Sequence, residues 1–104
     1  MTLQELGAVR RALDAGELDE RLAQLRYGET EKARAKVRNV LEGFERSFGA
    51  DDKRPVALCS APGRTEICGN HTDHQHGRVL AGAVDLDFLA CAAKNGTNRI
   101  RFQS

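Results

Sequence analysis

The sequence has 104 residues, of which 40% are hydrophobic and 30% charged, and its 16 basic residues nearly balance its 15 acidic ones. This length suits one domain with a single core, and the charge balance argues against a nucleic-acid-binding face. No apolar run reaches the roughly 20 residues of a membrane span, and the first residues lack the pattern of a signal peptide. We therefore expect a cytoplasmic protein that contacts neither nucleic acid nor membrane.

Helices are predicted in residues 1–54, which hold 22 of the 31 charged side chains. The first helix follows a capping-box pattern, Thr2 with Glu5, and its apolar stripe ends at Gly16. A second, short helix fits residues 18–25, where leucines recur at helical spacing.

The third helix is predicted from an N-cap at Thr30 to Phe48, just before Gly49. Its apolar side chains fall at spacings of three and four residues and predict a buried face: Ala33, Val37, Val40, Leu41, Phe44 and Phe48. The basic cluster between Lys32 and Arg38 predicts a solvated face rather than a nucleic-acid stripe, because acidic residues flank it.

Strands are predicted after Pro55. A short apolar run over residues 56–59 is followed by a turn at residues 61–63, and a longer strand over residues 79–93 has a bend at Gly82. Asn95-Gly96 predicts a hairpin turn into a last strand over residues 98–103. The fold class is therefore α+β, with N-terminal helices followed by an antiparallel or mixed sheet.

This pattern predicts two parts, a helical N-terminal extension over residues 1–54 and a strand-rich part over residues 55–104. The three cysteines have no paired spacing, and we expect Cys59, Cys68 and Cys91 to be free thiols. Of these, Cys59 and Cys91 lie in apolar strand patterns and are expected to be buried.

Residues 61–77 hold most of the groups capable of chemistry, including all three histidines. We expect a loop here, because loops on a rigid scaffold are where such groups reach a ligand. Four of its side chains could ligate a metal: His71, Asp73, His74 and His76. Because the chain offers no second pair of closely spaced ligands, we expect no metal. A loop that merely faces solvent is the alternative to a ligand-binding loop.

The stretch from Ser60 to Gly77 reads S-A-P-G-R-T-E-I-C-G-N-H-T-D-H-Q-H-G. It resembles the signature of galactokinases, which belong to the GHMP family of small-molecule kinases. Their sequence motif is close to G-R-x-N-x-I-G-E-H-x-D-Y. The matching residues are Gly63, Arg64, Gly69, His71 and Asp73. The sequence departs from the pattern with Glu66 for Asn, Cys68 for Ile, Asn70 for Glu and His74 for Tyr.

The resemblance implies a catalytic role for Arg64 beside the transferred phosphate, where a fixed guanidinium stabilises developing negative charge. It implies that Asn70, His71 and Asp73 bind the hydroxyls of a small-molecule sugar. It also implies the fold of part of the GHMP kinase N-terminal domain. The intact parent would transfer the γ-phosphate of ATP, with Mg²⁺, to the anomeric hydroxyl of galactose.

The sequence lacks the family's glycine- and serine-rich phosphate loop, of the type P-x-G-x-G-L-S-S-S. We therefore expect an N-terminal piece of a kinase that is inactive alone, with ATP and Mg²⁺ bound by residues outside it. Two alternatives remain: a related GHMP kinase for another hexose or for arabinose, and a non-catalytic sugar-binding or regulatory derivative.

The isolated piece is also expected to form a homodimer. The strand predicted at residues 98–103 would leave an open edge, and Leu86, Phe88 and Ile100 would build an uncovered sheet face.

Overall fold

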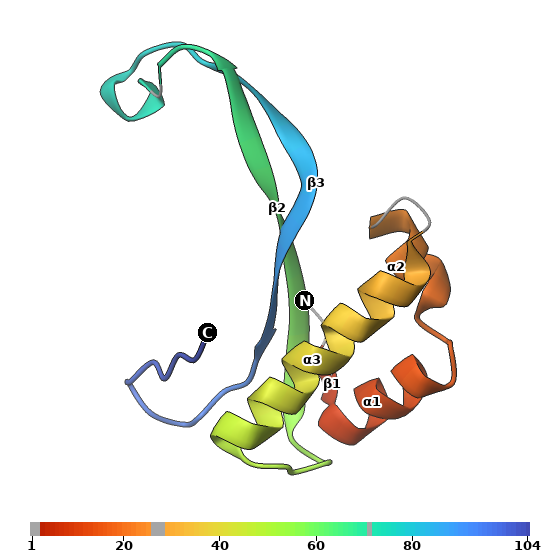
Figure 1. Ribbon diagram of the computed structural model, residues 1–104. Helices are drawn as coiled ribbons and strands as arrows, with labels where there is room; N and C mark the ends of the chain where they lie inside the picture. The colour runs from red at the N-terminus through yellow and green to blue at the C-terminus, as the bar shows by residue number, and fades with distance from the viewer. Residues whose placement is uncertain (1–2, 26–28, 71) are drawn as a thin grey trace.

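The computed structural model describes residues 3–25, 29–70 and 72–104. The elements follow in the order β1 (Gln4–Glu5), α1 (Leu6–Asp14), α2 (Asp19–Leu25), α3 (Thr30–Phe48), β2 (Pro55–Cys68), η1 (Asp73–Gln75) and β3 (Leu80–Ala92). The strands form one sheet in the order β1-β2-β3, and both pairings are antiparallel (Figure 1). The predicted α+β class is confirmed. In the described stretches, no helix is both long and apolar enough to cross a membrane.

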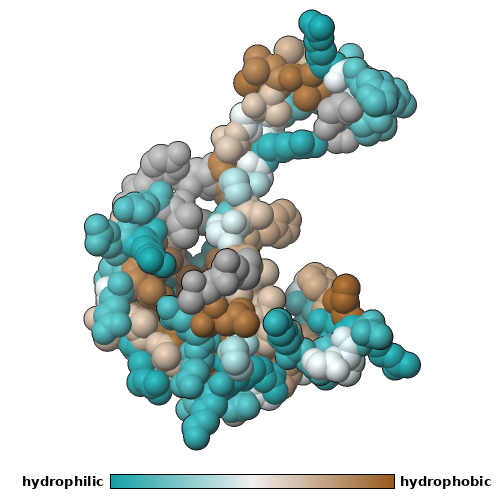
Figure 2. Space-filling model, turned by 180° about the vertical axis from the view of Figure 1, so that it is seen from behind, coloured by the Kyte–Doolittle hydropathy of each residue, from teal (hydrophilic) through white to brown (hydrophobic). Residues whose placement is uncertain are grey.

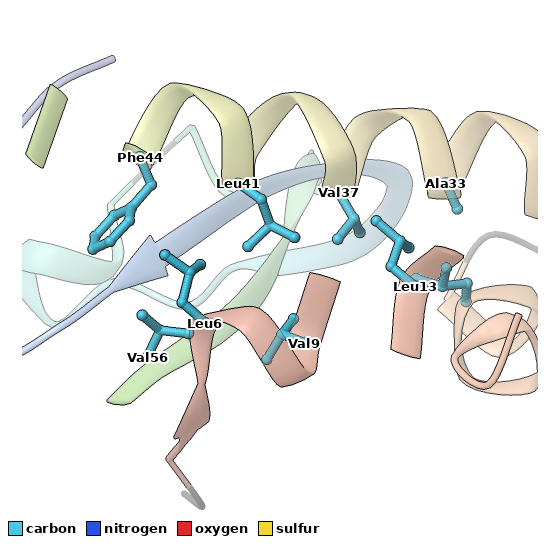
Figure 3. Close-up of a cluster of buried hydrophobic side chains, with 9 residues drawn as sticks. Leu6, Val9, Leu13, Ala33, Val37, Leu41, Phe44 and Val56 are labelled. Atoms are coloured by element: carbon cyan, nitrogen blue, oxygen red, sulfur yellow. The ribbon is translucent and has the colours of Figure 1, made fainter. Parts of the chain in front are cut away.

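The core lies where the three helices meet the first residues of β2 (Figure 3). Its buried side chains are Leu6, Val9, Leu13, Leu22, Ala33, Val37, Leu41, Phe44 and Val56. Four of them come from α3 at the predicted spacing, so the apolar stripe of that helix is confirmed. Val56 is 1% exposed and ties the sheet to the helices.

The two long strands continue well past the helices and form a projecting arm (Figures 1 and 2). The radius of gyration is 16.6 Å, whereas a compact chain of this length has about 13 Å. Large apolar side chains on the arm and after it are exposed: Ile67, Val79, Leu80, Leu86, Phe88, Ile100 and Phe102. Of the expected uncovered sheet face, Leu86 and Phe88 are exposed on β3, whereas Ile100 is exposed but lies outside any strand.

The starts of α1 and α3 both differ from the prediction in the residue that caps the helix. Helix α1 begins at Leu6 with Glu5 as N-cap, because β1 holds residues 4 and 5 extended against β2. The predicted cap Thr2 lies outside the described residues. Helix α3 includes Thr30 as its first residue and has Glu29 as N-cap. Neither helix has a side-chain cap hydrogen bond.

The turn predicted at residues 61–63 is wrong, because β2 runs through it. Ala61 pairs with Phe88 and Pro62 with Asp87. Proline lacks an N–H donor but is tolerated on an edge strand, and β1 pairs only with the first two residues of β2. The segment predicted as a loop over residues 61–77 is therefore half strand, and its true loop begins at Gly69.

Two irregularities bend the arm. Between the pairs Pro62–Asp87 and Arg64–Ala83, residues 84–86 of β3 lie opposite Gly63 alone. Nearer the end of the arm, Ile67 is an extra residue on β2. Gly82 pairs regularly with Thr65, so the two irregularities lie on either side of the predicted position and not at it. Bulges of this kind increase the local twist of a strand pair.

The predicted hairpin at Asn95-Gly96 is also wrong, and residues 98–103 form no strand. The Asn95 side chain instead closes a local turn: its Oδ1 accepts from the Thr97 N–H at 3.0 Å, and its Nδ2 donates to the Arg99 carbonyl at 2.8 Å. The open strand edge expected here is absent among the described residues. The homodimer stays a prediction that rests on the exposed sheet face alone.

We expect Leu41→Ala to lower the free energy of unfolding by about 2–5 kcal/mol, because it opens a cavity in the core. Leu41 is 2% exposed and lies centrally in the cluster (Figure 3). The matched control is Leu86→Ala on the arm, which removes the same atoms from an exposed position and should change stability by less than about 0.5 kcal/mol. Urea unfolding of both variants measures the difference, and equal losses would contradict the assignment of the core.

Candidate functional site

The outer half of the arm carries the residues singled out by the sequence. Arg64 and Glu66 lie two positions apart on β2, so they share one face of the strand pair. Their cross-strand neighbours are Ala83 and Ala81. Both long side chains are exposed, since alanines opposite them provide no cover. Arg64 is thus held by a strand rather than by the predicted loop.

The end of the arm is a turn folded on itself, which we call the tip (residues 69–79). Thr72 organises it: its Oγ1 donates to the Gly69 carbonyl at 2.8 Å. The Thr72 carbonyl accepts from the N–H groups of Gln75 at 3.0 Å and Gly77 at 2.8 Å. These bonds enclose the single turn of 3₁₀-helix η1. The tip therefore has its own hydrogen-bonded structure.

Two glycines are required by the geometry of the tip. Gly69 has a φ of 118°, and a Cβ on it would lie 2.7 Å from the Arg78 carbonyl oxygen. A Cβ on Gly77 would lie 2.0 Å from Thr72 Oγ1. Both contacts are far closer than real Cβ atoms allow, so any larger residue would displace the turn.

The structure places the predicted site residues in different parts of the arm. Asn70 is exposed with a φ of 51°, a left-handed conformation that asparagine tolerates better than most residues. Asp73 begins η1, so the structure brings these two positions into one turn. The prediction for His71 lies outside the described residues. Arg64 is not in the turn: it lies four positions before Cys68 on β2, about 13 Å at the usual rise per residue.

The backbone gives a reason for one departure from the family pattern. A left-handed residue next to Gly69 favours asparagine over glutamate, because the short amide side chain can bond locally. His76 has a similar backbone conformation, with a φ of 62°. The dipeptide Gly69-Asn70 is a turn signal that sequence reasoning could have used and missed.

Metal binding finds no support in the described residues, where no group of three or more His, Cys, Asp and Glu side chains lies close enough to hold an ion. His71 lies outside these residues. The expected absence of a metal therefore stays a prediction.

Two basic residues of α3 pair with acids of the other two helices. Arg34 Nη2 lies 2.5 Å from Asp19 Oδ2, and Arg38 Nη2 lies 3.1 Å from Asp14 Oδ1. Lys36 also pairs with an acid, but it turns toward the sheet, where its partner is Asp87 of β3. The prediction of a wholly solvated face is wrong at this position. Asp87 could have been suspected, since it is a charge within an apolar strand.

All three cysteines are free. Cys68 is exposed, whereas Cys59 and Cys91 are half-buried, so the expectation of burial holds in part. Burial, and secondarily the proximity of Cys59, raises the pKa of the Cys91 thiol to about 11. The thiolate is the reactive form, so Cys91 should be the least reactive of the three.

Comparison with known proteins places this arm within a recognised family. Residues 42–94 match the model of the galactokinase galactose-binding signature, just over half of the chain. The chain is 35% identical over 66 residues to a galactokinase of Lacticaseibacillus casei, covering 64% of this chain and 16% of that one. It is 37% identical over 65 residues to the human galactokinase, covering 62% and 15% respectively. A galactokinase of Candida maltosa is 30% identical over 74 residues, covering 71% and 34%.

The chain belongs to the galactokinase galactose-binding signature family. It spans about a sixth of the length of the bacterial and human relatives and about a third of the yeast one. No solved structure matches it significantly.

We expect Gly77→Ala to open the tip without unfolding the core. The added Cβ collides with Thr72, so the local free energy of opening, measured by hydrogen exchange at the Gln75 amide, should fall by about 1–3 kcal/mol. The control is Gly43→Ala in α3, where a Cβ meets nothing closer than 3.9 Å and should stabilise the helix by up to about 1 kcal/mol. Unchanged protection of Gln75 in Gly77→Ala would refute the tip geometry.

We expect iodoacetamide at pH 8 to alkylate Cys68 first and Cys91 last. Cys68 is exposed, whereas the raised pKa of Cys91 leaves roughly one thiol in a thousand ionised at this pH. Mass spectrometry of timed samples from the non-reduced protein gives the order. Equal rates at the two positions, or a protected pair of cysteines, would contradict the structure.

Proposed function

We propose that this chain is the sugar-binding part of a galactokinase. The intact enzyme would transfer the γ-phosphate of ATP to the anomeric hydroxyl of galactose and release galactose 1-phosphate. The observation that carries this proposal is the coincidence of the family match with the arm. Residues 42–94 include all of β2, the tip and β3, and the tip is where the polar groups gather.

The tip suits a polyhydroxylated ligand. Asn70 and Asp73 share one short turn, and together they offer an amide that both donates and accepts and a carboxylate that accepts from two hydroxyls. Such directional groups distinguish sugar epimers, which apolar contacts separate poorly. We assign Asn70, His71 and Asp73 to the sugar hydroxyls on this basis and on the family pattern.

Arg64 is assigned a different role, because it lies on the strand and not in the tip. Its guanidinium would stabilise the charge that develops on the phosphoryl oxygens during transfer. A fixed arginine beside the reaction centre would also keep a neighbouring carboxylate ionised.

We assign the binding of ATP and Mg²⁺ to residues of the parent enzyme outside these 104. The chain contains no glycine-rich phosphate loop, and its described residues hold no cluster of metal ligands. The nucleotide would supply the phosphoryl group, and this chain would supply the sugar site and the arginine.

A titration of the 104-residue chain with galactose, followed by amide NMR, tests the proposal. Shifts should concentrate at residues 69–79 and be weaker with glucose. Asp73→Asn should weaken galactose binding about 10- to 100-fold, the usual range for a lost hydrogen bond to a charged group. Arg64→Lys should leave the affinity within about threefold, since Arg64 would act on phosphate.

The matched control is Asp14→Asn, which makes the same chemical change at an exposed ion pair on α1 and should not alter the affinity. The chain alone should make no galactose 1-phosphate from ATP and galactose. The proposal fails if galactose shifts no tip amide, or if Asp73→Asn binds as the unaltered chain does.

A further inference from the structure

Three polar side chains from three different elements meet at the base of the arm. Lys36 of α3 pairs with the Asp87 carboxylate at Oδ1, and its Nζ also donates to the Asp87 carbonyl at 2.6 Å. From β2, Ser60 Oγ donates to Asp87 Oδ2 at 2.6 Å. Both carboxylate oxygens are thus used, one by the helical layer and one by the neighbouring strand. We call these three residues the Asp87 anchor.

The Asp87 anchor lies where packing ends and the arm begins. The apolar contacts between the sheet and the helical core reach Leu58 on β2 and Leu89 on β3. Ser60 and Asp87 are the next residues on the same face of each strand. Beyond them, apolar side chains are left in solvent, as at Leu86, which is 70% exposed.

The anchor is also partly withdrawn from water. The Asp87 side chain is 15% exposed and that of Lys36 34%, so the pair is screened less than a surface ion pair. Removing one partner would leave the other charge half-buried and unpaired, which costs far more than the loss of an exposed pair.

Between the Asp87 anchor and the first irregularity of the arm lie only Ala61 and Pro62 on β2. The strand pair then shifts register opposite Gly63, and Arg64 follows at once. A two-stranded ribbon has wide freedom of twist, so the orientation of Arg64 depends on how firmly its base is held. The residue types fit that task, because a carboxylate accepts from an ammonium and a hydroxyl at the same time.

We propose that Asp87, held by Lys36 and Ser60, is a positioning residue that fixes the direction in which the arm leaves the helices. It would thereby place Arg64 and the tip relative to the rest of the protein. The roles of Arg64 and the tip in catalysis and sugar binding rest on the proposed function. The orientation of the arm is a property of this chain alone and is tested without sugar.

The experiment measures residual dipolar couplings of backbone amides in a dilute aligning medium. In the unaltered protein, amides of α3 and of arm residues 64–66 and 81–83 should fit one common orientation. In Asp87→Asn, which keeps the shape but removes the charge and one acceptor oxygen, the arm couplings should fall by about half while those of α3 persist. Asp14→Asn is the matched control and should change neither set, because its partner Arg38 lies on the exposed side of α3.

Arm couplings that stay as in the unaltered protein in a folded Asp87→Asn variant would overturn the proposal. If that variant does not fold, Ser60→Ala decides, because it removes one hydrogen bond and leaves the ion pair: reduced arm couplings support the proposal and unchanged ones overturn it. Lys36→Met with Asp87→Leu separates orientation from stability. This double variant removes both charges without an orphaned partner, so the fold should persist while the arm couplings still fall.

Galactose affinity is measured in parallel on the same samples. The tip makes its own hydrogen bonds, so Asp87→Asn should bind galactose within about threefold of the unaltered chain. If no sample binds galactose, the proposed function fails and the coupling result still stands. If galactose binds but the arm couplings do not change, the positioning role fails alone.

Discussion

The burial of Val56 among side chains from α1 and α3 is the contact on which the rest of the structure depends (Figure 3). It lies at the second residue of β2, and the helices hold the sheet only near the start of β2 and the end of β3. Among the described residues, the core reaches only to Leu58 on β2 and to Leu89 on β3. The rest of the hairpin must project, and its apolar side chains stay in contact with water.

Packing and chemistry are consequently separated along the strands. The buried half has small and branched side chains with few polar groups, whereas the outer half has Arg64, Asn70 and Asp73. Tight packing favours a unique backbone at the base, and local hydrogen bonds serve the same purpose at the tip. Between these two ordered regions, the register shifts set the twist of the strands.

The sequence predicted what depends on local periodicity. Helix α3 and its buried face were predictable because its apolar residues recur at helical spacing, and β3 was predictable from its long apolar run. Residues 61–63 were mistaken for a turn because proline and glycine report local preference, whereas pairing with β3 is decided by tertiary contacts. The hydrogen bonds of Lys36 and Ser60 to Asp87 could not be predicted from the sequence either, because the three side chains meet only after the strand pair and the helix have packed.

The pairing of β1 with β2 has a consequence for the order of folding. Gln4 meets Val56 across 52 positions of the chain, whereas the pair next to the tip, Cys68 with Leu80, is separated by only 12. The entropy of closing a loop grows with its length, and nonlocal contacts form late in consequence. The hairpin can therefore form from its tip before β1 pairs with β2, whereas the core is complete only once Leu6, directly after β1, is in place.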